Sequence, residues 1–108
     1  MIHDTIQRLE ARLRGSEALP ETTREELLSL LATLRAEIAQ LPATSATQAQ
    51  TIAELTDRSA KEATGKNPER LQGAWDELVD AARDFEESHP RLVQVVNNIA
   101  NTLASLGI

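Results

Sequence analysis

Residues 27–41 read LLSLLATLRAEIAQL, and this stretch decides the fold. Its large apolar side chains recur at alternating intervals of four and three, at Leu27, Leu31, Leu34, Ile38 and Leu41. That spacing places them on one stripe of an amphipathic helix, as in coiled coils. A single helix of this length is marginally stable in water, so the stripe predicts that other helices cover it.

Three further segments carry the same spacing. Their stripes are Ile2, Ile6, Leu9 and Leu13; Leu71, Trp75, Leu78, Ala82 and Phe85; and Leu92, Val96, Ile99, Leu103 and Leu106. Glycines and prolines separate the segments, as expected at helix ends. The sequence therefore predicts an all-α protein, one domain over residues 1–108, with four or five helices in an antiparallel, coiled-coil-like bundle. The expected helices span about 2–14, 21–41, 46–64, 68–87 and 90–106.

We expect the larger stripe residues to lie in the core or in a subunit interface. The candidates are Leu31, Leu34, Ile38, Trp75, Leu78, Phe85, Leu92, Val96, Ile99, Leu103 and Leu106. Ser45 and Asn67 stand where side chains could cap the third and fourth helices.

Residues 45–64 give the weakest signal. Their only large aliphatic side chains are Ile52 and Leu55, and the rest of the possible buried face is alanine. Helix propensity is favourable, but packing would stabilise such a helix little. An exposed helix, a partly mobile helix and a linker all fit this stretch.

The composition excludes several classes of function. The chain has 108 residues, no cysteine, 17 acidic and 11 basic side chains, and a formal net charge of −6. Disulfides, cysteine nucleophiles and cysteine-based metal sites are excluded. The negative charge disfavours binding to nucleic acid and to anionic membranes. Charges throughout the first 15 residues, and the lack of an apolar run near ~20 residues, predict a cytoplasmic protein without signal peptide or membrane span.

The last segment carries no charged side chain from Leu92 to Ile108. Its face opposite the stripe is made of amides and a hydroxyl, at Gln94, Asn97, Asn98, Asn101 and Ser105. Solvated helix faces usually gather charges, whereas an uncharged amide face fits burial in a bundle or a subunit interface. A terminal helix with a neutral outer face is the alternative.

The small size of the chain also bears on its assembly. Because burial of the core offsets the loss of conformational entropy on folding only narrowly, we predict self-association into a homo-oligomer.

Two polar clusters are candidates for a site. Glu86 and His89 have the Glu-x-x-His spacing of di-iron bundles, but Pro90 breaks the helical spacing and the sequence lacks a second such motif. We interpret Ser88, His89 and Pro90 as a joint between helices, either a sharp turn or a kink.

The second cluster is Asp76, Asp80 and Asp84, which repeat every four residues opposite the apolar stripe of their helix. Such a face solubilises a helix, docks a basic partner or binds a divalent ion weakly. Gly73, on the same helix, either permits close helix approach or has no role.

The leading hypothesis is a non-enzymatic structural or interaction protein, a homo-oligomeric scaffold or adaptor, with no catalytic residue and no cofactor. The alternatives are a helical metal-binding protein that uses Glu86 and His89, and a regulator that docks a basic protein partner on the acidic face.

The end of the chain resembles a known family. Residues 85–92 read FEESHPRL, followed by Ile99, Leu103 and a Leu-Gly-Ile ending at 106–108. This pattern is similar to the C-terminal signature of a bacterial family, the domain of unknown function numbered 4404. The resemblance is sharpest over residues 85–108 and only pattern-level over 5–41, while the middle, 43–67, is longer than the family pattern. It implies a small bacterial cytosolic helical protein without assigned activity, in which residues 88–90 form a structural joint.

Overall fold

Five α-helices and one short 3-10 helix build the structure, a computed structural model that describes residues 2–17, 19–65 and 67–106. The helices are α1 (Ile2–Gly15), α2 (Glu21–Ala39), α3 (Ala46–Thr64), α4 (Pro68–Arg83) and α5 (Pro90–Leu106), and the 3-10 helix η1 is Ala43–Ser45. The described residues contain no strand. The predicted all-α bundle is confirmed.

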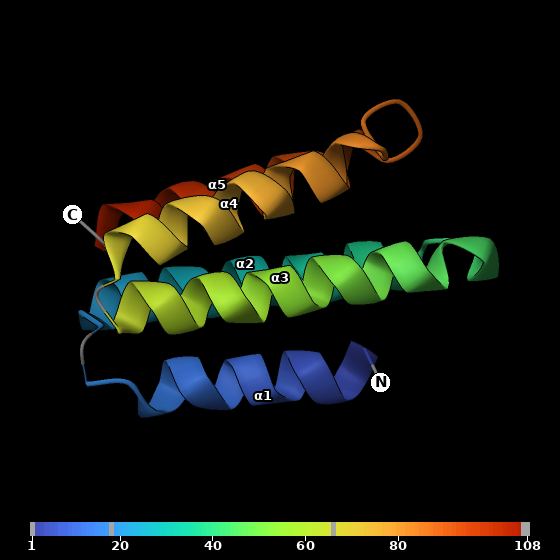
Figure 1. The fold of residues 1–108 in the computed structure, drawn as a ribbon. Coiled ribbons are helices and arrows are strands. Elements are labelled where there is room, and N and C mark those ends of the chain that lie inside the picture. The colour runs from blue at the N-terminus through green and yellow to red at the C-terminus, as the bar shows by residue number, and fades with distance from the viewer. Residues whose placement is uncertain (1, 18, 66, 107–108) are drawn as a thin grey trace.

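Successive helices run in opposite directions, and α3 lies between α1 and α4 (Figure 1). α3 also contacts α5, while α2 contacts α1 and α5. The second helix ends at Ala39 and the fourth at Arg83, each earlier than the sequence pattern suggests. Phe85 therefore lies in the turn after α4 rather than in the helix.

The four apolar stripes close on one another within a single chain. At most 2% of the surface of the following side chains is exposed: Ile6, Leu9, Leu13, Leu27, Leu31, Leu34, Leu78, Leu92, Val96 and Leu103. Ile38, Phe85 and Ile99 are also buried. The radius of gyration, 12.8 Å, is close to the ~13 Å expected for a compact chain of this length. One chain thus covers most of its own stripes, while Ile2, Leu41 and Trp75 stay partly exposed.

The third helix corrects the expectation that packing would contribute little to residues 45–64. α3 contacts three other helices, and its face buries Ala49, Ile52, Ala53, Ala60 and Ala63. Alanines carry little hydrophobic signal, but their small side chains let neighbouring helices approach closely. α3 is therefore a central helix rather than an exposed helix or a linker.

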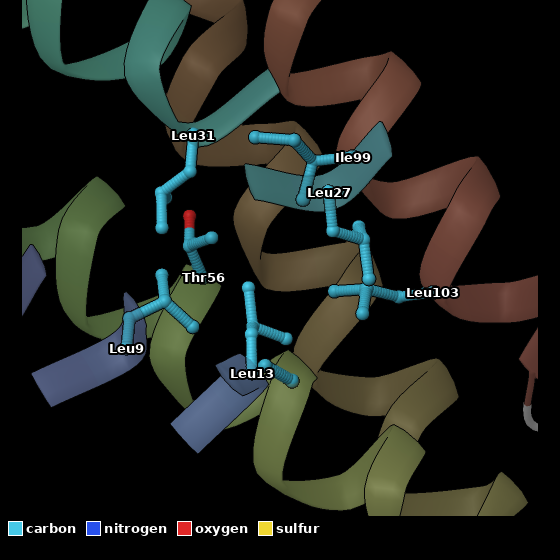
Figure 2. Close-up of a pocket in the computed structure, with 8 residues that line it drawn as sticks. Leu9, Leu13, Leu27, Leu31, Thr56, Ile99 and Leu103 are labelled. Carbon is cyan, nitrogen blue, oxygen red and sulfur yellow. The ribbon is translucent and has the colours of Figure 1, made fainter. Parts of the chain in front are cut away.

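The centre of the bundle is filled. Leu9, Leu13, Leu27, Leu31, Thr56, Ile99 and Leu103 converge from α1, α2, α3 and α5 (Figure 2). The space left among them is about 10 Å³, at the lower limit for one water molecule. The Thr56 hydroxyl donates a hydrogen bond to the Ile52 carbonyl at 2.7 Å, so this buried polar group is satisfied. This interior space is too small for a ligand.

Helix ends are fixed by contacts other than the expected caps. Neither Ser45 nor Asn67 makes a side-chain capping hydrogen bond, which corrects both predictions. The α1–α2 connection is instead held by Arg24, whose guanidinium donates to the carbonyl oxygens of Leu13 at 3.2 Å and Ser16 at 2.6 Å.

Candidate interaction surface

The rotation of α4 about its own axis determines which of its side chains face the core and which face solvent. Its buried stripe is Leu71, Ala74, Leu78 and Ala82, all at most 4% exposed. Trp75, which the spacing of large side chains places in the stripe, is only partly buried, and the small Ala74 is fully buried instead. The sole tryptophan of the chain therefore lies beside the core, on the side of α4 that faces α5.

Trp75 and the partly buried Val79, one turn apart on α4, line a groove between α4 and α5, which we call the α4–α5 groove. Asn97 and Asn101 line it from α5. The groove is open to solvent and has a volume of about 530 Å³. Its lining is completed from α4 by Gln72, Asp76, Asp80 and Arg83. An aromatic and an aliphatic side chain thus lie between a charged wall on α4 and an uncharged amide wall on α5.

The charged wall of the groove is held by contacts along α4. The amide of Gln72 donates to Asp76 at 3.0 Å, and Arg83 lies 3.4 Å from Asp80 in an exposed ion pair. Of the three aspartates singled out in the sequence, the structure brings Asp76 and Asp80 to the groove. Asp84 is exposed in the turn after α4 and does not line it.

Most of the net negative charge of the chain lies on the hairpin of α4 and α5. Residues 68–106 contain seven carboxylates and three arginines, which give −4 of the total −6. Glu77 is turned toward α3, where Arg58 pairs with it at 3.0 Å. The other carboxylates of the hairpin produce a negative electrostatic potential around the groove, which favours the approach of positively charged groups.

The joint at Ser88, His89 and Pro90 is a sharp reversal between α4 and α5 (Figure 1). The His89 amide donates to the Phe85 carbonyl at 2.7 Å, and the two rings meet edge to face with centroids 6.0 Å apart. His89 Nδ1 lies 3.1 Å from the Ser88 hydroxyl. Pro90 is the first residue of α5, a position where its missing N–H costs nothing. The joint sets α5 against α4 and so positions both walls of the groove.

The structure does not assemble the proposed metal site. Glu86 is exposed in the turn, while His89 is engaged by Phe85 and Ser88. Within the part of the chain that the structure describes, no three or more carboxylate or histidine side chains gather as a group that could hold a metal ion.

The amide face of α5 points away from the bundle. Gln94, Asn98, Asn101 and Ser105 are exposed, and Asn97 is partly buried beside the groove. The bundle of one chain does not bury this face, so its burial in a subunit interface stays a prediction. Leu106 is the last residue of α5, and the burial of its side chain lies outside what the structure describes, as does the Gly107–Ile108 ending.

The sequence pointed to the aspartates and to Trp75, but not to the groove that they share. The sequence does contain a pattern that marks the groove: Trp75 and Val79 lie one helical turn apart, and an aspartate directly follows each of them. Reading that signal requires knowledge of which side of α4 meets α5, which helical periodicity alone does not give.

The helices offer no membrane-spanning segment: over the described residues, none combines the length and apolar character needed to cross a bilayer. Fold and groove together define a small all-α bundle with one acidic, tryptophan-bearing surface. The chain belongs to the family described as Domain of unknown function (DUF4404), whose model matches residues 27–108 and confirms the resemblance. No curated protein and no solved structure matches the chain.

Proposed function

We propose that the chain is a non-enzymatic interaction protein that binds a positively charged segment of another protein in the α4–α5 groove. The observation that carries the proposal is the position of Trp75. It is partly exposed in an open groove between Asp76 and Asp80 on one side and uncharged amides on the other.

Two physical arguments support this partner. Tryptophan is among the residues that contribute most to binding energy at protein interfaces, especially near the centre of a concave patch. Carboxylates at the rim attract basic partners and raise their association rate, while they repel acidic ones. Nucleic acids and anionic lipids are disfavoured by the same field.

Capture from the source cell, followed by binding of the isolated partner, tests the proposal. Wild-type protein should retain a basic protein, and capture should fall in the Trp75→Ala variant and in Asp76→Asn/Asp80→Asn. Glu86→Gln/Glu87→Gln is the matched control, because it removes two exposed acids outside the groove. A basic protein retained equally by all four proteins would contradict the groove as its binding surface, as would an acidic partner.

Self-association is the second candidate, and the exposed amide face of α5 is the observation that favours it. In a homo-oligomer this face would be covered by a second copy, giving the scaffold that the sequence suggests. Light scattering coupled to size exclusion should then report a mass above 11.8 kDa. Asn98→Lys, which places a charge on the face, should shift the mass to that of the monomer. A monomer at every concentration, with a melting temperature independent of concentration, would remove this candidate.

A further inference from the structure

The shape of the α4–α5 groove narrows the chemistry of its occupant. We infer that the groove receives a single amphipathic helix, about three turns long, with basic residues along one flank and uncharged polar residues along the other. This inference rests on the proposed function, since it specifies the positively charged segment.

The length follows from the α4 side of the groove. It runs from Gln72 to Arg83, which corresponds to roughly 17 Å of helix at 1.5 Å per residue. A helix of about 11–12 residues matches that span. The groove also follows the line where two packed helices meet, a surface into which the side-chain ridges of a third helix fit.

The backbone chemistry of the occupant follows from the groove lining. Along the centre of the groove, Trp75 and Val79 present mainly hydrocarbon, so an extended chain lying there would have to find partners for its N–H and C=O groups on the two walls. A helix satisfies these groups internally and presents only side chains to the groove.

The side-chain pattern of the occupant follows from spacing on α4. Trp75 and Val79 are four residues apart, so they match apolar side chains one turn apart on the occupant. Asp76 and Asp80 repeat the same interval on one wall and match two Lys or Arg residues one turn apart, of which the second competes with Arg83 for Asp80. Asn97 and Asn101 on the opposite wall match uncharged polar side chains.

Binding of designed peptides, followed by the emission of Trp75, tests the inference. The chain has one tryptophan and no tyrosine, so the signal reports on the groove directly. The first probe is a peptide of about 14 residues that carries Leu at helical spacing, Lys on one flank and Gln on the other. The second has the same sequence except for a Pro in place of one Gln at its centre, which breaks the helix.

We expect the helical peptide to shift Trp75 emission to shorter wavelength and to bind at least tenfold more tightly than the proline peptide. Asp76→Asn/Asp80→Asn should weaken its binding about threefold to tenfold, the effect of two exposed ion pairs. Glu86→Gln/Glu87→Gln, with the same change in net charge, should leave binding unchanged. Val79→Gln, which keeps the reporter, should weaken binding more than tenfold.

The helical occupant would be overturned if the two peptides bound with equal affinity, or if neither peptide bound. It would also be overturned if Asp76→Asn/Asp80→Asn and Glu86→Gln/Glu87→Gln weakened binding of the helical peptide equally. The proposed function fails separately, when a natural basic partner is captured without dependence on Trp75, Asp76 and Asp80. Capture that depends on these residues, combined with equal affinity for both peptides, would keep the function and reject the helix.

Discussion

A single side chain, Arg24, fastens the connection between α1 and α2. Its guanidinium donates to the carbonyl oxygens of Leu13 and Ser16, and it pairs with Glu21 at 2.8 Å. The side chain is 22% exposed, so much of this contact is shielded from water. Several donors in a fixed plane are needed to reach these oxygens, and only arginine supplies them.

Arg24→Lys should therefore lower the free energy of unfolding by about 1–3 kcal/mol, because the ammonium cannot replace the planar set of hydrogen bonds. Urea denaturation measures the change. Arg14→Lys is the control, since Arg14 is 66% exposed and contacts Glu10 only at 3.9 Å, and it should change stability by less than about 0.5 kcal/mol. Equal stability of the two variants would contradict the role given to Arg24.

Gly73 has no structural role that requires glycine. A Cβ added there would meet nothing within 4 Å, which rejects close helix approach as its reason. Gly73→Ala should stabilise the protein by about 0.5–1 kcal/mol, the difference in helix propensity. Thermal or urea unfolding checks this. Gly65→Ala should bring no such gain, because its Cβ would lie 3.1 Å from the Lys61 carbonyl oxygen. A loss of stability in Gly73→Ala would be the contrary result.

At the scale of elements, α3 is the helix on which α1, α4 and α5 pack. Ala60 is 1% exposed and lines the central space of about 10 Å³, which leaves no room for a larger side chain. Ala60→Leu should destabilise the protein by about 1–3 kcal/mol through overpacking. Ala36→Leu, at an exposed position of α2, should change stability by less than about 0.5 kcal/mol. Should calorimetry find both variants equally stable, α3 would be peripheral.

Four of the helices could be predicted from apolar spacing, since Ile6, Leu31, Leu78 and Ile99 each mark a stripe that the structure buries. α3 was undervalued because its burial depends on alanine, which favours a helix but carries little hydrophobic signal. Trp75 lies beside the core rather than within it, because side-chain size does not decide which of two neighbouring positions faces the core. Close packing of α3 and α4 gives that place to Ala74.

The groove could not be predicted, although its acidic wall could. A groove needs two helices in a defined rotation and separation, and helical periodicity specifies neither. The joint had been recognised from His89 and Pro90, but the contact between the rings of Phe85 and His89 depends on the reversal itself.

At the scale of the molecule, one chain closes its own core and concentrates its charge on one hairpin. The α4–α5 unit holds −4 of the net −6, and the groove within it presents the sole tryptophan. Increasing salt should weaken binding of a basic partner, because exposed charges are screened within about 10 Å at 0.1 M. Isothermal titration at several ionic strengths measures this slope, and a slope of zero would contradict the electrostatic part of the proposal.

The most direct test of the central claim is collisional quenching of Trp75 fluorescence in the isolated protein. The quenching by each ion is divided by its quenching of N-acetyltryptophanamide at the same ionic strength. If Trp75 lies in an open, acid-walled groove, this ratio should be larger for caesium than for iodide. Asp76→Asn/Asp80→Asn should narrow that difference, whereas Glu86→Gln/Glu87→Gln should preserve most of it. The partly exposed position of Trp75 would be contradicted if its emission were that of a fully buried indole and neither ion quenched it at any protein concentration.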